Sequence, residues 1–571
     1  MMPGDRKSAG VFRSRFIIEC VFFLALAIAS TWPLAEKMGH CLPLGTEDAA
    51  TVPLFNVWTV WWNSDRLASG YKGYWNAPIF HPAENTFAFS EPQPLSALAA
   101  PVIWVTGNRV FAYNVLLLAY VWLNGLAAYS LLYHLHFHRL IAVTGAVMIE
   151  LLPLIHSWLG VLQLVPVFGI LWTFWALHKF GRRPTVLHGI LFGACYGLVY
   201  LLCSYYGLFL VIPLMTAGFW LVKDHMRIPK MWASLLLGGL SAMMLVLPVV
   251  LMQHRFGSAV HQLHDKAYLM ELSADIVDYL FSPWPQLIKI DAFNPMEKYA
   301  VFKLNPGFIK AGLAAAGIGW GIASRKRRQW MLFCVTMLCV SFVLSLGPSL
   351  EIIGWNPYML LVKTVPGFGQ ARNVFRFAVF VQLSLVLLSV LGLQSVVELM
   401  ERYALPTSAR RMAYFALILI AATAVTEVLP ARQQLYETPV YSVNHAWIDW
   451  LTGKTPANSV IACAPFPFKP DVVSYEREAI WMYWQTFHKR IMVNGYSGFF
   501  PKRFLDLKME MVYFPEPEII DHLVHLGVTC CVVGRDSEYG ERTRQYAGID
   551  PRMELVFSDA RSMIDIYRIG K

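Results

Sequence analysis

The sequence predicts a polytopic α-helical membrane protein with about eleven transmembrane helices, followed by a soluble α/β domain at its C-terminus. The first observation is composition: 56% of the 571 residues are hydrophobic and 15% are charged, whereas soluble proteins carry about 25% charged residues. The second is a series of apolar stretches that approach the roughly 20 residues needed to cross a bilayer. The third is that short β runs alternating with helical patterns appear only after about residue 431, as in a small α/β domain.

The stretches that we expect to cross the membrane are 16–35, 110–135, 140–157, 158–178, 185–203, 204–222, 231–253, 306–323, 329–348, 373–397 and 411–429. The first is longer than the about 7–15 apolar residues of a signal peptide, so we expect a retained helix. The apolar stretch Leu95–Thr106 is too short to cross a bilayer, and we expect it to be interfacial or re-entrant.

Positive charge predicts the orientation of these helices, because cytoplasmic loops are enriched in Lys and Arg. With the N-terminus inside, the inner loops hold Arg139, Lys179, Arg182, Arg183, Lys223, Arg227, Lys230, Arg325, Lys326, Arg327, Arg328, Arg402, Arg410 and Arg411. The C-terminus is then outside. The net charge of +10 is interpreted as an orientation signal, and nucleic acid is not expected as a partner.

The predicted domains are a transmembrane domain, residues 1–430, and a soluble domain, residues 431–571, on the non-cytoplasmic side. Two long outer loops, 36–109 and 254–305, are rich in aromatic residues and proline, and such aromatics usually lie at the headgroup level. In the soluble domain we expect helices near Trp447–Leu451 and Pro517–Leu526. The expected strands are Ser459–Cys463, Ile491–Val493, Val528–Val533, Glu554–Phe557 and Met563–Ile569.

Several common sites are absent from the sequence. There is no GxxxxGK[ST] motif and no GxGxxG between a strand and a helix, so nothing indicates a nucleotide donor. The nine cysteines include no CxxC pair, which argues against a zinc or thioredoxin-like site. Cys463 has two interpretations, a bridge to Cys530 or Cys531 in an oxidising compartment, or a buried free thiol.

The first outer loop carries the richest set of polar and aromatic residues. It begins with Gly45-Thr46-Glu47-Asp48, continues through a tryptophan-rich stretch at 55–62, and reaches Phe80-His81-Pro82, Asn85-Thr86 and Ser90-Glu91. A carboxylate flanked by aromatics and partly shielded from water suits general-base chemistry. The alternative interpretation of Asp48 is a solvated loop acid or the N-cap of a helix.

These motifs, together with Pro366-Gly367-Phe368-Gly369 followed by Arg372 and Arg376, resemble the GT-C superfamily of membrane glycosyltransferases. The resemblance covers nearly the whole chain. It implies an inverting glycosyltransferase that moves a sugar from a polyprenyl-phosphate donor to a glycan, lipid or protein acceptor. The location that it implies is the outer face of a bacterial cytoplasmic (inner) membrane, with a cytoplasmic N-terminus, a periplasmic or extracellular C-terminal domain, and membrane lipids as partners.

The resemblance also implies roles for individual residues. Asp48 matches the acidic residue early in the first outer loop that deprotonates the acceptor, Glu47 is an alternative, and Glu91 is a second loop acid that orients the acceptor or assists a metal. The family often has Asp-Pro at this point, whereas Ala49 follows Asp48 here, which leaves the exact assignment open. No metal ligand and no certain cofactor is assigned, and a divalent cation, Mg²⁺ or Mn²⁺, is left open.

A leaving lipid phosphate needs positive charge, and the fork of arginine matches phosphate geometry. We expect Arg372 and Arg376, four residues apart, to share a helix face and bind the donor phosphate; the alternative is interfacial snorkelling. His261 and His264 suit either a metal site or an exposed turn. The turn Asn494–Pro501 suits either glycan contact or a purely structural role.

Two other functions compete with the glycosyltransferase. A transporter or flippase of lipid-linked glycans usually places charged groups near the membrane midplane. Glu150 is a candidate for such a group. The alternative interpretation of Glu150 is a helix-packing partner of a nearby polar side chain. A non-catalytic assembly protein built on a GT-C frame would not need Asp48.

Overall fold

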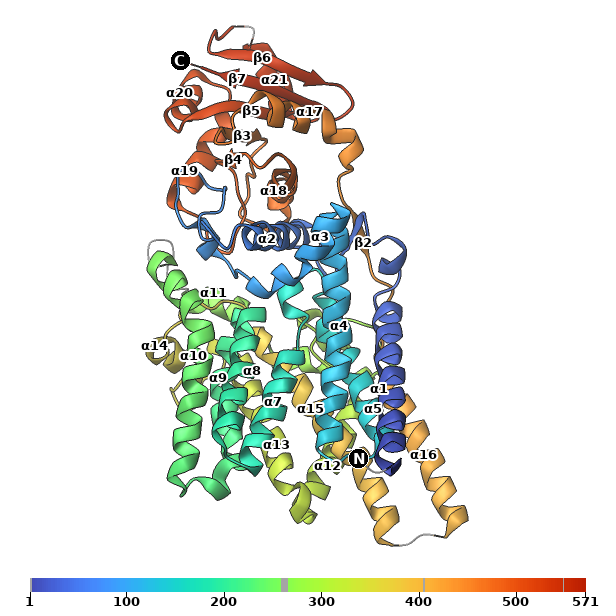
Figure 1. Cartoon of the computed structure of the whole chain (residues 1–571). Helices are drawn as coiled ribbons and strands as arrows, with labels where there is room; N and C mark the ends of the chain where they lie inside the picture. The colour runs from blue at the N-terminus through green and yellow to red at the C-terminus, as the bar shows by residue number, and fades with distance from the viewer. Residues whose placement is uncertain (1–2, 258–264, 404–405, 548, 571) are drawn as a thin grey trace. The chain divides into compact units, whose positions relative to one another are not determined.

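The protein divides into two compact units that do not follow chain order. The computed structural model describes residues 3–257, 265–403, 406–547 and 549–570 (Figure 1). The helical unit comprises Met1–Ala35, Leu117–Pro248 and Gln262–Gln433, and the sheet unit comprises Glu36–Leu116, Val249–His261 and Gln434–Lys571. The first outer loop therefore belongs to the same compact unit as the C-terminal domain.

The helical unit is built from long apolar helices. They are α1 (Pro3–Ser30), α4 (Arg109–His134, which begins in the sheet unit), α5 (Arg139–Glu150), α6 (Pro153–Ser157), α7 (Phe168–Arg182), α8 (Val186–Leu202), α9 (Ser204–Val222), α10 (Pro229–Gly257, which ends in the sheet unit), α11 (Lys266–Glu271), α12 (Phe308–Ala323), α13 (Arg325–Ser345), α14 (Pro357–Thr364), α15 (Ala378–Arg402) and α16 (Thr407–Thr426). Short 3-10 turns connect several of them, including η4 (Leu162–Leu164), η5 (Lys223–His225), η6 (Ile276–Leu280), η7 (Asp291–Tyr299), η8 (Gly347–Ser349) and η9 (Val374–Phe377).

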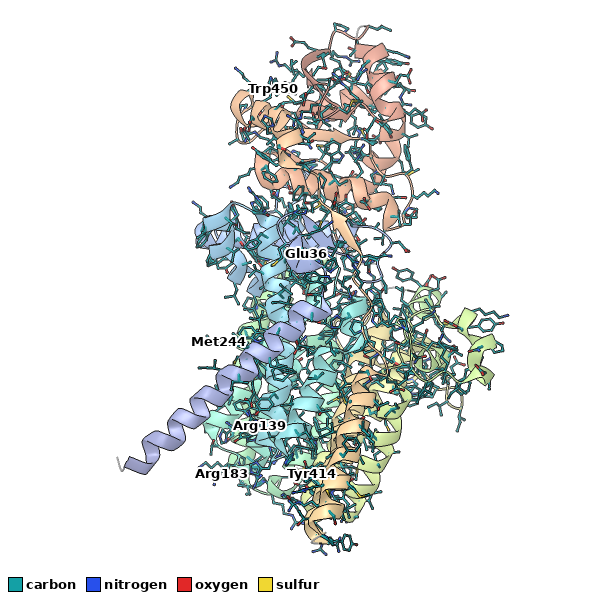
Figure 2. The ribbon with its side chains drawn as sticks, turned by 90° about the vertical axis from the view of Figure 1, so that its right-hand side faces the viewer. Glu36, Arg139, Arg183, Met244, Tyr414 and Trp450 are labelled. Carbon is teal, nitrogen blue, oxygen red and sulfur yellow. The ribbon has the colours of Figure 1, made fainter. Side chains whose placement is uncertain are left out.

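Among the described residues, eight helices are long and apolar enough to cross a membrane. Shorter apolar helices at Ile17–Ser30, Val186–Leu202 and Phe308–Ala323 coincide with three further expected spans, and a fourth, Pro94–Thr106, coincides with the expected interfacial stretch. The chain is thus a multi-pass membrane protein, while the number of spans stays a prediction. α15 is 89% buried over its most apolar stretch and α10 only 11%, which makes α15 the core of the bundle and leaves apolar α10 side chains such as Met244 facing outward (Figure 2).

α12 packs closely against α15 because glycines remove side chains from the contact. A Cβ atom on Gly317 would overlap the carbonyl oxygen of Leu388, and one on Gly392 would overlap that of Leu313. Gly317 thus lies in a close helix contact, whereas Gly319 has no neighbour that a Cβ would meet. Close backbone approach through small residues is typical of helix contacts in membranes.

The expected spans 140–157 and 158–178 coincide with two of the eight candidate spans, Arg139–Ser157 and Leu162–Arg182, but neither is one continuous helix. α5 ends at Glu150, α7 begins only at Phe168, and the residues between form the short α6 and η4. Pro153 starts α6 and Pro166 lies just before α7. Proline lacks the N–H that continues a helix and clashes with the preceding turn, so each proline sets a helix boundary.

The loops that we expect inside carry their basic residues at one end of the helical unit. Arg183 and Tyr414, close to Arg410 and Arg411 in sequence, lie toward the same end, and Arg139 lies in that half of the bundle (Figure 2). There Arg327 is buried, pairs with Glu398 at 2.8 Å, and donates to the carbonyl oxygen of Leu135. The ion pair joins α13 to α15, and the hydrogen bond to Leu135 joins α13 to the end of α4.

The sheet unit contains a five-stranded sheet in the order β4-β3-β5-β7-β6. The strands are β3 (Val460–Ala464), β4 (Ile491–Met492), β5 (Val528–Gly534), β6 (Met553–Asp559) and β7 (Ile564–Ile569). β3 is parallel to β4 and β5, and β7 is antiparallel to β5 and β6. All five expected strands are confirmed to within a few residues, and among the described residues Cys463, Cys530 and Cys531 are buried free thiols.

Helices cover this sheet, and only two of them were expected. They are α17 (Tyr441–Lys454), α18 (Glu476–His488), α19 (Lys502–Glu510), α20 (Pro517–His525) and α21 (Glu538–Ala547), and the 3-10 turns η10 (Val473–Tyr475) and η11 (Met511–Tyr513) accompany them. α17 and α20 match the expected helices. The other three were not expected, because polar and charged residues interrupt the apolar pattern of their sequences.

The first outer loop forms part of the same core. It contains β1 (Cys41–Pro43), which pairs with β2 (Leu435–Glu437), as well as α2 (Thr51–Ala68), η2 (Thr86–Phe89), η3 (Pro94–Ala99) and α3 (Ala100–Thr106). α2 packs on α18, and the indole N–H of Trp58 donates to Gln485 Oε1 at 2.8 Å. Trp58, Trp61 and Trp62 are at most 4% exposed. These tryptophans are core residues of the sheet unit, not the membrane-surface aromatics that we expected.

Candidate active-site residues

Asp48 lies in the short connection between β1 and α2, in the sheet unit. Gly45 takes a positive φ of 64° in the turn, and α2 begins at Thr51. The N-cap of α2 is Ala50, so Asp48 is not the cap, one of its two alternative roles. The Asp48 side chain is exposed, in contrast to the partial shielding that we expected, and no hydrogen bond or ion pair joins its carboxylate to another described residue.

Residues of the C-terminal segment hold this connection in place. The backbone N–H of Ala50 donates to Glu476 Oε2 at 3.0 Å, and the hydroxyl of Thr51 donates to the carbonyl oxygen of Val472 at 2.6 Å. Burial, and then the charge and hydrogen bond of Glu476, raise the pKa of Tyr436. The Glu476 carboxylate therefore lies at Ala50, two residues after Asp48 in the chain. Nothing in the local sequence indicates it, since the two acids are separated by most of the chain.

The structure places Glu47 next to Asp48, half-buried, and Glu91 elsewhere on the sheet unit. Glu91 precedes Pro92, whose carbonyl oxygen accepts a hydrogen bond from Asn63 at 2.8 Å. Asn63 is about 18 Å along α2 from Thr51, taking 1.5 Å per residue. Glu91 thus lies beside the second half of α2, whereas Asp48 precedes its N-terminus.

The turn Asn494–Pro501 packs into the same unit. The N–H of Phe499 donates to the carbonyl oxygen of Phe89 at 3.1 Å, and the carbonyl oxygen of Asn494 accepts the N–H of Phe80 at 3.0 Å. A Cβ atom on Gly495 would meet the ring of Phe80. These contacts favour the structural role of the turn over glycan contact.

Arg372 and Arg376 belong to the helical unit, and they do not share a helix face as expected. Arg372 lies in the irregular stretch before η9, while Arg376 lies within η9, a 3-10 helix. Asn373 between them has a left-handed φ of 60°, which no α-helical segment contains. The helix that contains Arg376 therefore begins only after Arg372, and the two side chains do not lie on one helix.

Arg376 is a buried cation with an incomplete set of partners. It is 8% exposed, and its guanidinium carbon lies 4.4 Å from the centre of the Tyr205 ring. Its Nε and Nη1 atoms have no hydrogen-bond acceptor among the described residues. The hydroxyl of Tyr358 is also buried without a partner there, and burial, followed by neighbouring Tyr205, raises the pKa of Tyr358. The Tyr358 hydroxyl therefore stays protonated and can donate.

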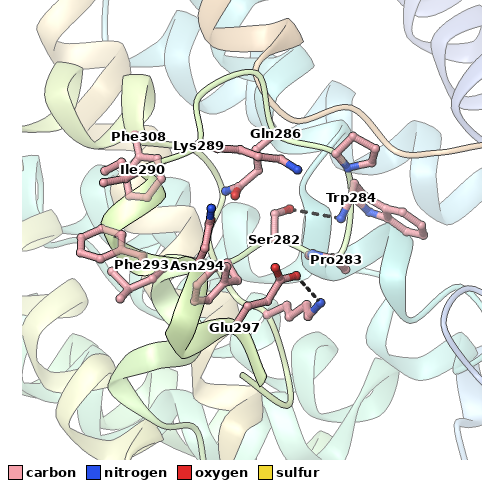
Figure 3. A pocket seen from close by; sticks show the side chains of 14 residues that line it. Ser282, Pro283, Trp284, Gln286, Lys289, Ile290, Phe293, Asn294, Glu297 and Phe308 are labelled. Carbon is pink, nitrogen blue, oxygen red and sulfur yellow. Dashed lines mark hydrogen bonds and ion pairs between the residues drawn. The ribbon is translucent and has the colours of Figure 1, made fainter. Parts of the chain in front are cut away.

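The second outer loop encloses a cavity of about 270 Å³ within the helical unit (Figure 3). Lys289, Gln286 and Asn294 lie around it, and Lys303 pairs with Glu297 at 2.9 Å. The indole Nε1 of Trp284 and the amide Nε2 of Gln286 have no acceptor among the described residues. The cavity thus presents N–H donors and a net positive charge, since Lys289 and Lys303 face one carboxylate, that of Glu297.

Glu150, at the end of α5, is fully buried. Neither carboxylate oxygen has a hydrogen-bond partner within the described ranges, and the carboxyl group lies against Gly125. His156 Nε2 donates to the backbone carbonyl oxygen of Glu150 at 3.0 Å. Glu150 is therefore packed against a glycine and not against the polar side chain that we considered.

No group of three or more His, Cys, Asp or Glu side chains is arranged to hold a metal ion in the part of the chain that the structure describes. His261 and His264 lie outside the described residues. The use of a divalent cation, Mg²⁺ or Mn²⁺, stays a prediction.

Comparison with solved structures shows the fold. The mycobacterial arabinofuranosyltransferase AftD, as mutant R1389S, matches over 98% of this chain and 42% of that chain, with a TM-score of 0.57 and 14% identity. A second class of the same protein matches with a TM-score of 0.50. Crystalline ArnT from Cupriavidus metallidurans, bound to undecaprenyl phosphate, covers 97% of this chain and 98% of that chain at 11% identity, with a TM-score of 0.38.

The chain spans about two fifths of the length of AftD, so the likeness concerns the fold of that part alone. No protein-family model matches the sequence, and a search of curated proteins gives no match either. The fold predicted from the motifs of the first outer loop is confirmed, whereas the roles of Asp48, Glu47, Glu91, Arg372 and Arg376 stay predictions.

Proposed function

We propose that this membrane protein, which has the fold of the GT-C glycosyltransferases, is an inverting glycosyltransferase that uses a polyprenyl-phosphate-linked sugar. The acceptor is a glycan, a lipid or a protein. The reaction takes place on the outer face of a bacterial cytoplasmic membrane, in agreement with the basic residues of the expected inner loops. The C-terminal domain then faces the periplasm or the exterior.

The observation that carries the proposal is the incomplete hydrogen bonding of buried Arg376. Burying a charge without a partner costs several kcal/mol, so buried cations are normally paired. A phosphate oxygen would supply the missing acceptor, and arginine binds phosphate through two parallel hydrogen bonds. Tyr205, whose ring lies against Arg376, also neighbours Tyr358, and we assign the Tyr358 hydroxyl as a further donor to the phosphate.

Asp48 is the general base in this proposal. Its carboxylate takes the proton of the acceptor hydroxyl while the hydroxyl oxygen forms a bond to the anomeric carbon of the donor sugar. The bond between that carbon and the phosphate oxygen breaks, and the lipid phosphate leaves with the electron pair. Attack opposite the leaving group inverts the configuration. Glu47 is the substitute base, and Glu91 orients the acceptor. Asp48 and Arg376 are assigned separately, each from its own compact unit.

The exposure of Asp48 supports this role because a general base must be reachable by the acceptor. The connection that carries Asp48 is fixed by two hydrogen bonds, from the Ala50 N–H to the Glu476 carboxylate and from the Thr51 hydroxyl to the Val472 carbonyl oxygen. Arg372, half-buried and close in sequence to Arg376, is assigned as a second phosphate ligand.

The test is the substitution Arg376→Met, with Arg410→Met as the matched control at an exposed arginine of α16. Binding of undecaprenyl phosphate to the detergent-solubilised chain is measured by native mass spectrometry. Losing charge-assisted hydrogen bonds to phosphate costs about 1.5–3 kcal/mol, so the affinity should fall roughly tenfold to a hundredfold in Arg376→Met alone.

The same variant separates a ligand-binding arginine from a structural one. Without lipid, Arg376→Met should be at least as stable as the wild type to thermal unfolding, because an unpaired buried cation has been replaced by an apolar side chain. Unchanged lipid binding, or a large loss of stability without lipid, would contradict the assignment of Arg376 to the donor phosphate.

A further inference from the structure

The sheet unit contains a second cavity, of about 710 Å³, that the proposed chemistry does not use. This volume falls in the range of about 300–1,000 Å³ that is usual for small-molecule sites. Four stretches of chain form its wall: Gly39 and His40 before β1, the end of α3 with the start of α4, the connection from β2 together with α17, and the C-terminal half of α18. We call it the α17–α18 pocket.

One side of the α17–α18 pocket is aromatic. The ring of Tyr441 stacks on that of Phe487 at 4.8 Å between centres and 18° between planes. The guanidinium carbon of Arg109 lies 4.1 Å from the centre of the same Phe487 ring. Tyr441 nevertheless remains 41% exposed. An aromatic ring supported from behind and open in front is a flat apolar platform with a hydroxyl at its edge.

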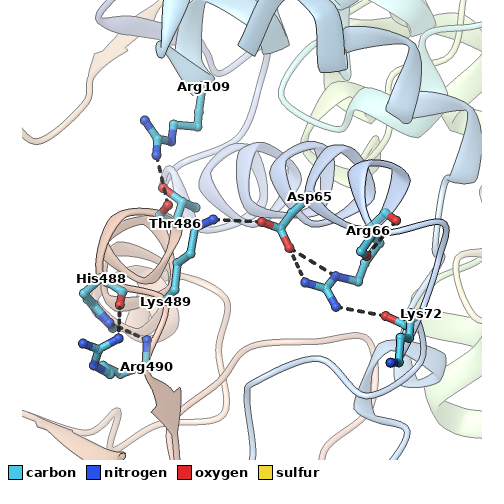
Figure 4. A network of polar contacts seen from close by, with 9 residues as sticks. Asp65, Arg66, Lys72, Arg109, Thr486, His488, Lys489 and Arg490 are labelled. Carbon is cyan, nitrogen blue, oxygen red and sulfur yellow. Dashed lines mark hydrogen bonds and ion pairs between the residues drawn. The ribbon is translucent and has the colours of Figure 1, made fainter. Parts of the chain in front are cut away.

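The polar groups of the pocket are few and held in place. Arg109 donates through Nη2 to the carbonyl oxygen of Thr486 at 3.1 Å (Figure 4) and through Nη1 to that of Gly107. Its Nε atom is buried without an acceptor in the described residues. Asp449, which also lines the pocket, is exposed and accepts a long hydrogen bond from the Tyr441 hydroxyl at 3.4 Å.

This combination indicates the chemical class of the ligand. One cation and one carboxylate balance each other, which does not favour a charged ligand. A ring with an apolar face fits the platform of Tyr441, and hydroxyl groups that donate and accept hydrogen bonds fit Asp449, Ser442 and Thr452 at its edge. Sugars have both properties, since their C–H groups form an apolar face and their hydroxyls surround it.

We propose that the α17–α18 pocket binds a neutral glycan, with one sugar ring on Tyr441 and its hydroxyls on Asp449. The inference rests on the proposed function in one respect: the bound glycan is interpreted as part of the acceptor, held by the sheet unit while another part of it reacts. The binding site itself does not depend on Asp48 or on the donor.

A phospholipid headgroup is the competing occupant. The end of α3 borders the pocket at Thr106, and Leu98, Trp104 and Val105 in the same stretch are exposed apolar side chains, as at a membrane surface. An anionic headgroup would nevertheless meet the carboxylate of Asp449. The balance of charge therefore favours the glycan.

The experiment uses the full-length chain in detergent, without donor, on an array of bacterial cell-envelope oligosaccharides, followed by titration calorimetry with the tightest binder. Tyr441→Ala should weaken binding by about tenfold or more, the effect of losing about 1.4 kcal/mol, and Asp449→Asn should weaken it as well. Tyr513→Ala is the matched control, because Tyr513 is 58% exposed on the same unit and does not line the pocket.

Three outcomes overturn the proposal: no oligosaccharide binds the wild type, binding is unchanged in both pocket variants, or Tyr441→Ala lowers binding to phosphatidylglycerol vesicles and not to glycans. In transfer assays Tyr441→Ala should raise the acceptor KM and leave kcat unchanged. A chain that binds glycan through Tyr441 but transfers no sugar would retain this site and contradict only the proposed function.

Discussion

The backbone N–H of Ala50 donates a hydrogen bond to the carboxylate of Glu476, at 3.0 Å, although the two residues are 426 positions apart in the chain. Ala50 is the N-cap of α2, and its own side chain offers no acceptor. Glu476 thus performs from a distant segment the role of a capping carboxylate, which also suits the positive end of the helix dipole. The connection that carries Asp48 depends on it.

We therefore predict that Glu476 is a positioning residue for Asp48. Glu476→Ala removes the acceptor and should lower kcat for sugar transfer, because loss of a capping group frees the connection at a cost of about 1 kcal/mol. Glu476→Gln keeps a carbonyl oxygen and should restore most of the rate. Equal rates in the wild type and the Ala variant, or equal losses in both variants, would argue against positioning.

The second prediction concerns Asp48 itself. Asp48→Asn retains the size and hydrogen bonding of the side chain but cannot accept the acceptor proton, and loss of a general base typically costs about 10²–10⁴ in rate. Transfer to acceptor should be abolished, while thermal stability is unchanged because the side chain is exposed. Glu47→Gln and Glu91→Gln are the controls, and both should be milder.

The outcomes of these three substitutions separate the remaining assignments. A severe Glu91→Gln variant beside an active Asp48→Asn variant would identify Glu91 as the base. Normal function of all three in cells would favour the non-catalytic assembly protein. Thermal unfolding of each variant is measured first, so that lost activity is not confused with lost folding.

The third prediction is a pH dependence of stability from Glu478 in the sheet unit. Burial raises the pKa of Glu478 from 4.5 to about 8, against the opposing effect of its hydrogen bond from Asn494. Between pH 4.5 and about pH 8, Glu478 is therefore protonated in the folded state and ionised in the unfolded state. The contribution of Glu478 to the free energy of unfolding is greatest below that window, falls as pH rises through it, and is constant above about pH 8, with a slope of at most about 1.4 kcal/mol per pH unit.

Glu478→Gln should flatten this part of the curve and stabilise the protein at pH 8, since no charge is then buried. Thermal unfolding of the full chain, followed by tryptophan fluorescence at several pH values, measures both effects. A wild type and a variant with parallel curves would show that Glu478 titrates normally.

The fourth prediction tests the transporter. Glu150→Gln preserves the shape of a side chain whose oxygens have no described partner, so a glycosyltransferase should keep its full rate and at least its wild-type stability. A transporter that moves protons or ions through this residue would instead lose function. Loss of function in Glu150→Gln together with normal function in Asp48→Asn would favour the transporter over the enzyme.

The fifth prediction is the orientation in the membrane. The native cysteines of the C-terminal part are buried, so a probe is introduced at exposed Ala560, in the turn between β6 and β7. Ala560→Cys should react with a membrane-impermeant maleimide in intact spheroplasts. Ser408→Cys, at the exposed start of α16, should react only after lysis. The reverse pattern would invert the topology.

Periodicity and composition alone were sufficient for much of the architecture. The apolar stretches coincide with helices because a segment in lipid must satisfy its backbone hydrogen bonds internally, whatever its neighbours are. The strands β3 to β7 were recognisable because each is a short run that contains Val or Ile and lies between polar and turn residues. The placement of Asp48 in the first long loop after the N-terminal helix needed no tertiary information. The lack of common nucleotide motifs needed none either.

Only the tertiary structure decided what the side chains between these elements contact. Trp58 and its neighbours have the same composition whether they face lipid headgroups or α18, and burial against Gln485 identifies them as core. Glu476 and Tyr441 are unremarkable in sequence, because their partners are distant in the chain. Whether Arg376 is paired depends on which acceptors the packing brings near it, and that is a property of the folded arrangement, not of any local pattern.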